Sequence, residues 1–180
     1  MTANEILQQL LAACDWVNPA QTVDRIVAGD GDRPVRTVLV TWISSLAACR
    51  TAIARGVDLL VTHEPTFWRH LDDFPEPVDQ YALAKQREIR EAGLTILRLH
   101  DSWDRFPGVG IPFAWAQYLG LPGAPVATGM AGYLHRYDVA PTTAGAFARQ
   151  VAVRTAALGE PVIQFAGDPG AVVSRIGTGT

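Results

Sequence analysis

The sequence is poor in charged residues, in lysine and in cysteine. Charged residues make up 18% of the 180 residues, below the roughly 25% usual for soluble domains, and Lys85 is the only lysine. The formal net charge is -3, and the arginines are spread along the chain instead of clustered. A chain without a basic stripe is not expected to bind duplex nucleic acid. The small charged fraction is compatible with a surface that other subunits partly cover.

Redox motifs, leader segments and membrane spans are also missing. Cys14 and Cys49 stand alone in apolar helical patterns, so buried free thiols in a reducing compartment are the preferred interpretation. Residues 1–16 lack the basic flank and long apolar run of a signal peptide. No later run reaches the roughly 18 apolar residues of a membrane span. These absences predict a cytoplasmic protein.

The first two thirds of the chain alternate between strand and helix patterns. Apolar residues at helical spacing predict an opening helix from Ile6 to Val17, capped by Thr2 or Asn4. Three strands and two helices follow, the first helix capped at Ser44 or Ser45 and the second closed by Gly93: strands 37–42, 57–62 and 94–99, helices 46–56 and 77–92. Such a series favours an α/β fold with a parallel sheet and right-handed crossovers.

The pattern restarts after a break rich in proline and glycine at residues 121–125. A helix at 109–120 precedes the break, and a strand at 132–139, a helix at 141–158 and strands at 161–166 and 171–176 follow it. We therefore predict a first α/β lobe at residues 1–122 and the start of a second at 123–180. Because the last strand runs into a Gly-rich turn, we expect the second lobe to be incomplete in this chain.

A histidine and a glutamate stand directly after the apolar strand at 57–62. Pro65 biases Glu64 toward an extended backbone, so the strand geometry is expected to persist through His63 and Glu64. Adjacent strand residues point to opposite faces, so the two side chains can bind one ion only if the chain turns, and otherwise contact two ions side by side. A lone histidine could equally cap the strand end, but here a second polar cluster accompanies it.

That second cluster follows the strand at 94–99 and contains His100, Asp101 and Asp104. Its alternative interpretation is an Asx turn with a helix cap. Because parallel strands present their carboxyl ends at one edge of a sheet, we predict that the two clusters meet there and bind metal. Imidazole and carboxylate donors suit zinc, manganese, iron or nickel, and neither cysteine is near enough in the sequence to suggest a thiolate site.

Four further residues carry weaker signals. His70 could add a metal ligand or a substrate contact, although an exposed loop histidine is the simpler interpretation. His135, on a predicted strand, is interpreted as structural. Trp68 and Trp103 lie beyond the two clusters and could wall a pocket or stack on a planar ring, with ordinary packing as the alternative.

Taken together, these segments resemble the dinuclear-metal-centre hexameric family, also called Nif-three-like and often labelled GTP cyclohydrolase I type 2 homologue. Residues 57–65 are similar to the family's aliphatic strand followed by Thr or Ala, His, His and Pro, with Glu64 where many members have a second histidine. Residues 100–104 are similar to a His-Thr-Asn-Leu-Asp motif whose closing aspartate binds metal. The Gly-Asp-Pro turn at 167–169 and the strand after it resemble a later stretch, so the match spans nearly the whole chain.

The resemblance implies a Nif-three-like fold of two α/β lobes with a mainly parallel sheet, assembled as a toroidal homohexamer. It also implies two divalent transition metal ions bound by His63, Glu64 and Asp104, with His100 and His70 as further candidates. Family members add a histidine and a glutamate from a segment nearer the C-terminus. We expect that pair to lie beyond residue 180 if this chain is a fragment.

Two functions are compatible with such a site. The first is a metal-dependent hydrolase acting on a nucleotide, phosphoester or cyclic amide, in which Glu64, if it is not a ligand, serves as general base. The alternative is a non-catalytic metal-binding or regulatory scaffold. A third possibility is that the two clusters are structural caps that bind no metal.

Overall fold

A computed structural model of the chain describes residues 1–73 and 79–180. The chain forms two compact units, Met1–Trp103 and Asp104–Thr180. Helix α4 (Asp101–Asp104) contains the residues on both sides of this division. The boundary between two lobes that we expect after residue 122 stays a prediction about the family's architecture.

The first unit is built on a four-stranded sheet of order β1-β4-β3-β2. Its strands are β1 (Arg25–Ala28), β2 (Val38–Thr41), β3 (Leu59–Thr62) and β4 (Thr95–Arg98). Strands β2, β3 and β4 run parallel, which confirms the predicted β-α-β-α-β series. Strand β1 pairs antiparallel with β4 and makes the sheet mixed. The sequence pattern did not predict β1, which is four residues long and has no fully buried residue.

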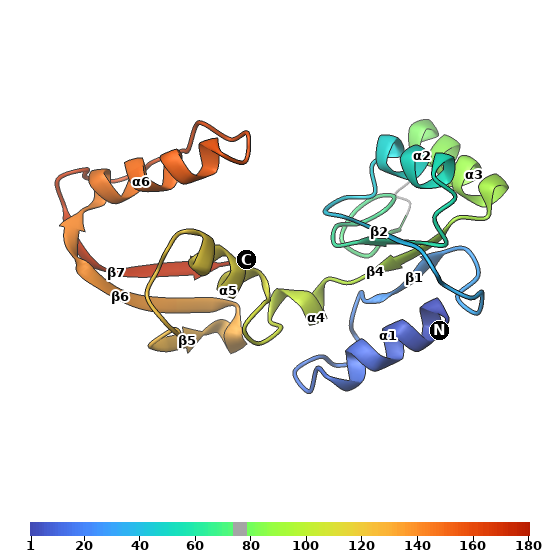
Figure 1. The fold of residues 1–180 in the computed structure, drawn as a ribbon, viewed down its shortest axis with the longest axis horizontal. Coiled ribbons are helices and arrows are strands. Elements are labelled where there is room, and N and C mark those ends of the chain that lie inside the picture. Colours follow the sequence, from blue (N-terminus) through green and yellow to red (C-terminus); the bar gives the residue numbers. More distant parts are fainter. Residues whose placement is uncertain (74–78) are drawn as a thin grey trace. The chain divides into compact units, whose positions relative to one another are not determined.

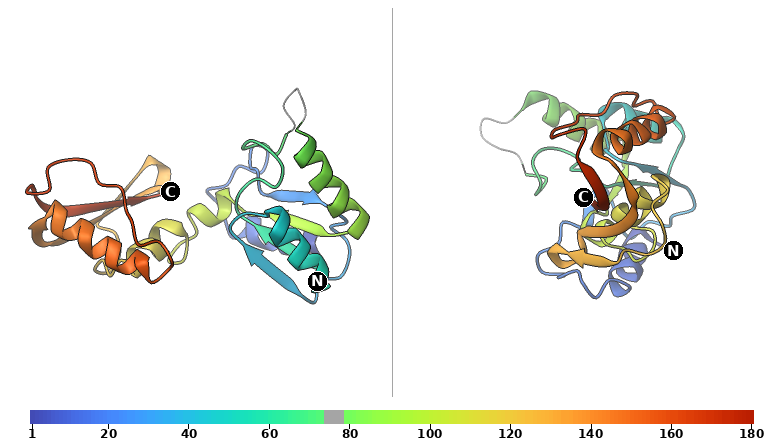
Figure 2. Two further views of the ribbon diagram at one scale, coloured as in Figure 1. Left: turned by 90° about the horizontal axis from the view of Figure 1, so that it is seen from above. Right: turned by 90° about the vertical axis from the view of Figure 1, so that its left-hand side faces the viewer.

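Three helices cover the two faces of this sheet. Helices α2 (Leu46–Ala54) and α3 (Gln80–Ala92) lie on one face, and α1 (Ala3–Ala12) lies on the other (Figure 1). Figure 2 shows α2 and α3 side by side over the sheet. Leu60 of β3 packs in one apolar cluster with α2 and α3, and its neighbour Leu59 packs in a second cluster with α1. Both leucines are fully buried, as expected for a parallel strand with helices on both sides.

The helix ends agree with the predicted caps. Thr2 forms a capping box with Glu5 at the start of α1, and the Ser45 hydroxyl accepts a hydrogen bond from the backbone at the start of α2. Gly93 closes α3 in the left-handed conformation at φ 62°, which glycine adopts without strain. Helix α1 is shorter than predicted, because turns replace it after Ala12. The predicted start of α3 at residues 77–78 lies outside the described residues.

The second unit is organised around an antiparallel sheet of order β5-β6-β7. Its elements are α5 (Ile111–Tyr118), β5 (Ala127–Gly129), a 3-10 turn η1 (Met130–Gly132), β6 (Leu134–Thr143), α6 (Ala144–Ala156) and β7 (Val172–Gly179). The strand predicted at 161–166 does not form. That segment pairs with no strand in the described structure, and Val162 is 79% exposed. Parallel pairing is therefore confined to the first unit.

The helices in the described parts of the chain are all too short or too polar to cross a lipid bilayer.

Candidate metal centre

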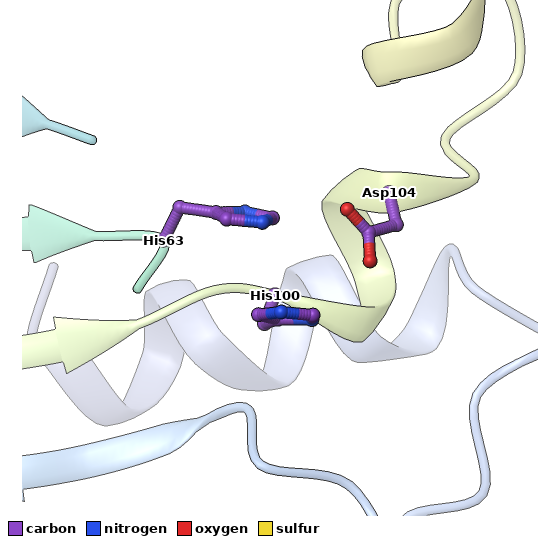
Figure 3. Close-up of side chains that lie close together, drawn as sticks. All are labelled: His63, His100 and Asp104. Atoms are coloured by element: carbon purple, nitrogen blue, oxygen red, sulfur yellow. The ribbon is translucent and has the colours of Figure 1, made fainter. Parts of the chain in front are cut away.

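Strands β3 and β4 bring the two polar clusters together. The strands are parallel neighbours in the register Thr62 opposite Arg98, so the chain leaves both at the same edge of the sheet. His63 follows β3 and His100 follows β4, and their imidazole rings stack with centroids 4.3 Å apart and an interplanar angle of 17°. The predicted meeting of the clusters at one sheet edge is confirmed (Figure 3).

A carboxylate from α4 completes a group of three potential metal ligands. One donor atom each from His63, His100 and Asp104 lies within 4.8 Å of the other two, and the close-up shows both rings directed toward the Asp104 carboxylate (Figure 3). Donors at about 2.1 Å from a shared ion are at most about 4.2 Å apart, so small side-chain rotations are enough to bind one ion. His63 and Asp104 are 7% and 4% exposed, which limits competition from water.

Asp24 fixes the start of α4 and thereby two of the three donors. Its carboxylate accepts hydrogen bonds from the backbone N–H groups of His100, Asp101 and Ser102, at 2.6, 2.9 and 2.8 Å. A negative charge at this position satisfies amides that have no partner within the helix. Asp24 itself is only 3% exposed. The Asp101 carboxylate does not make the predicted local Asx turn in these contacts: it accepts from the Thr22 hydroxyl at 2.8 Å and the Val23 backbone N–H at 3.2 Å, both distant in sequence.

Arg98, the last residue of β4, holds the backbone on the other side of the cluster. Its side chain is fully buried and donates from Nε to the carbonyl oxygen of His63 at 3.0 Å and from a terminal nitrogen to the carbonyl oxygen of His70. The Asp72 carboxylate lies 3.7 Å from the guanidinium. Desolvation lowers the pKa of Arg98, and the charge of Asp72 opposes that shift. One buried cation therefore positions both loop histidines through their main chain.

Trp42 supports His63 in two ways. Its carbonyl oxygen accepts the backbone N–H groups of His63 and Glu64, at 3.1 and 2.9 Å. Its indole ring stacks on the imidazole of His63 with centroids 4.3 Å apart. The ring of His63 is thus held between Trp42 on one side and His100 on the other.

The remaining predicted site residues take different positions. Glu64 and His70 do not belong to the three-donor group that the described residues form, so their roles as ligands stay predictions. The ring of His70 packs edge-on against His100 at 5.1 Å. His135 lies in the second unit, buried against the ring of Phe113, as a structural histidine would. Trp103 lines a cavity beside His63, whereas Trp68 is 46% exposed and does not.

The donor chemistry fits a divalent transition metal ion. Two imidazoles and one carboxylate form a set that zinc, manganese and iron accept. The Nδ1 atom of His100 lies 3.4 Å from the Asp101 carboxylate. In metal sites such a carboxylate orients the ring so that its other nitrogen can bind the ion.

Comparison with known proteins agrees with the family resemblance of the sequence. The sequence matches the family described as Duf34/NIF3 (NGG1p interacting factor 3) over residues 1–180. A stretch of 92 residues is 28% identical to a protein of Chlamydia muridarum called GTP cyclohydrolase 1 type 2 homolog. The match covers 51% of this chain and 36% of that protein, which is about a third of the relative's length. The fold is similar to a Staphylococcus aureus hypothetical protein, SA1388, with a TM-score of 0.74 and 16% identity over 98% of this chain and 71% of that one. It is also similar to TTHA1606 from Thermus thermophilus, with a TM-score of 0.65 and 22% identity over 88% of this chain and 61% of that one.

Proposed function

The chain belongs to the Duf34/NIF3 family, and from this premise we propose that it is a metal-dependent hydrolase whose His63, His100 and Asp104 hold a divalent cation. The observation that carries the proposal is the convergence of two imidazoles and a carboxylate within 4.8 Å. The two strand ends that carry the histidines come from separate segments of the chain, so this convergence is a product of the fold. The positioning contacts of Asp24 and Arg98 give the group a rigid frame.

Each residue of the site has a separate role in the proposed hydrolysis. A divalent cation held by three protein donors supplies Lewis acidity and lowers the pKa of water. His63 and His100 act as neutral ligands, and Asp104 contributes the negative charge that compensates part of the cation's charge. Glu64, next to His63 and outside the three-donor group, is the proposed general base for the attacking water.

We further propose a second ion, with His70 among its ligands, as the family resemblance implies; Glu64 either binds this ion or serves as the general base, and not both. A homohexamer located in the cytoplasm is part of the same proposal. The proposed substrate is a nucleotide, a phosphoester or a cyclic amide. The name of the chlamydial relative refers to GTP, but none of the three donors selects for a guanine ring.

The test combines metal analysis with a hydrolysis screen. Full-chain protein loaded with manganese or zinc should retain stoichiometric metal after gel filtration and hydrolyse at least one member of a panel of nucleotides, phosphoesters and cyclic amides. His63→Ala and Asp104→Ala should each lower metal affinity by more than about 100-fold, since they remove a direct ligand rather than an outer partner, and should abolish turnover.

His135→Gln is the matched control, because it replaces a buried histidine of the second unit that is not a member of the donor group. It should leave metal content and turnover unchanged. Stoichiometric metal without turnover on any substrate would favour the scaffold function. Absence of bound metal in the unaltered protein would show that the clusters are structural caps.

A further inference from the structure

One face of strand β2 lies open beside the donor group. Val38 and Val40 alternate along β2 and Trp42 follows, and these three side chains are 49%, 71% and 57% exposed. Val40 pairs in register with Val61 of β3, which packs in the apolar cluster around α1. The exposed residues therefore lie on the α1 face of the sheet. Helix α1 contacts β1 and β4, and β2 at the far edge of the sheet is left open on this side.

A cavity of about 470 Å³ lies between α1 and β2, within the roughly 300–1,000 Å³ that small-molecule sites occupy. Its walls include Ile6 and Leu10 from α1, Val40 and Trp42 from β2, and Trp103. His63 lies among its lining residues and is also a member of the donor group. The cavity therefore borders the candidate metal centre at His63.

Polar and apolar side chains line different parts of the cavity. Among the residues that the structure describes, no lysine, arginine, aspartate or glutamate lines the cavity. The polar residues are His63, Thr41 and Thr62, which all belong to the carboxyl ends of β2 and β3 or follow directly. The Thr62 hydroxyl already accepts a hydrogen bond from the backbone of Ser44 at 2.9 Å. One end of the cavity thus presents His63 of the donor group, and the rest offers aliphatic and indole surfaces.

We propose that this cavity binds an uncharged, apolar ring of the substrate while the hydrolysable group reaches His63, His100 and Asp104. The proposal rests on the proposed function and narrows its substrate class. A phosphate placed in the cavity itself would lose its hydration without meeting a cation, which is costly, so the cavity favours the apolar ring of a substrate whose charged or hydrolysable group lies at the metal centre. A ring compound with a hydrolysable amide, such as a cyclic amide, has the required division between an apolar body and one polar end.

Two hydroxamic acids separate the ring contribution from the metal contribution. Acetohydroxamic acid and 2-naphthohydroxamic acid carry the same metal-binding group, and only the second carries an apolar ring. Calorimetric titration of the zinc-loaded full chain should give an affinity at least about tenfold higher for the naphthyl compound, because the cavity removes its ring from water. Val40→Asp should reduce that preference to less than about threefold, because a carboxylate in the wall keeps the cavity hydrated.

Val38→Asp is the matched control. Val38 lies on the same strand and the same face, is also exposed, and does not line the cavity. This variant should keep the full preference for the naphthyl compound, and both variants should keep their zinc and their affinity for acetohydroxamic acid. Because both side chains are exposed, neither substitution removes packing from the core.

The outcomes distinguish the two proposals. Equal binding of both acids, or a preference that survives Val40→Asp, would overturn the cavity proposal and leave the metal centre intact. If the chain retains no zinc, the proposed function fails, and 2-naphthol binding to the metal-free protein, lost in Val40→Asp alone, would still support the cavity. Sedimentation that shows an oligomer dissociating equally in Val38→Asp and Val40→Asp would identify this face as a contact between copies and overturn the cavity proposal.

Discussion

The two units bury different kinds of polar group. In the first unit the buried polar residues include the charged Asp24 and Arg98, which hold the strand ends that carry His63 and His100. In the second unit, beyond Asp104 on α4, the buried polar residues among those described are neutral: His135, Thr155 and Thr178. Burying a charge costs several kcal/mol unless its partners are well placed. Such groups are expected where backbone must be held in one position for chemistry.

The two units also differ in their apolar cores. Both apolar clusters formed by the described residues lie in the first unit, one on each face of its sheet. Strands β6 and β7 of the second unit are mostly exposed along their length, with Val172 at 75%. We therefore expect the first unit to carry most of the stability of this chain, and the buried charges to carry the precision of the site.

Arg98→Met is expected to have the largest effect. It leaves the Asp72 carboxylate, 2% exposed, and two backbone carbonyls without their cation, and breaking such a buried pair costs about 3–5 kcal/mol. Amide hydrogen exchange should show this loss across β3 and β4, while protection of β6 and β7 changes little. Zinc affinity should fall as well, because the His63 backbone loses its anchor.

The control exploits the contrast between the units. Arg136 and Asp138 in β6 form an exposed ion pair at 3.8 Å, with side chains 49% and 59% exposed. Arg136→Met should therefore change stability by no more than about 0.5 kcal/mol. If the two arginine variants lose stability equally, the proposed difference between the units is wrong.

Asp24→Asn should have the second largest effect. The substitution keeps the shape of the side chain but removes the charge that three backbone amides, of His100 and of the first two residues of α4, share. We expect a loss of about 1–2 kcal/mol, typical of a helix-start contact, and a fall in zinc affinity of roughly tenfold, typical of an outer partner of a metal site. Chemical denaturation and zinc titration measure the two quantities.

Asp30→Asn is the corresponding control. The Asp30 carboxylate accepts one hydrogen bond, from the backbone of Asp32 at 2.9 Å, in an exposed turn. Both variants remove one carboxylate charge from the first unit, so the difference between them reports the position of that charge. An unchanged zinc affinity in Asp24→Asn would show that α4 is held in place by other contacts.

The arrangement of the first unit could be predicted from sequence because its signals are local. Apolar runs and caps such as Ser45 and Gly93 define its strands and helices, and parallel pairing then requires His63 and His100 to meet at one edge. The antiparallel strand β1 escaped prediction because four residues without a fully buried member give no distinct periodicity. The prediction of a strand at 161–166 was wrong. An apolar pattern forms a strand only where another strand pairs with it, and this segment pairs with none in the described structure.

The supporting residues of the site could not be predicted in the same way. Asp24 is distant in sequence from the helix it caps, and an aspartate in a loop has no local signature that identifies such a partner. Arg98 gives a weak signal, since it is the one charged residue in the apolar run at 94–99, but its contacts with the His63 and His70 carbonyls depend on the tertiary fold. Ligand types are therefore readable from sequence, whereas the residues that position them are not.

His135 offers the smallest effect and a test confined to the second unit. Burial lowers its pKa through desolvation, so the folded state favours the neutral ring. The associated stability is complete above the ordinary histidine pKa of about 6.5 and is lost as pH falls through the lower folded-state pKa. Amide exchange in β6 should show protection decreasing as pH falls below about 6.5, and His135→Gln should remove this dependence. Identical pH dependence in the variant would mean that a different group destabilises β6 in acid.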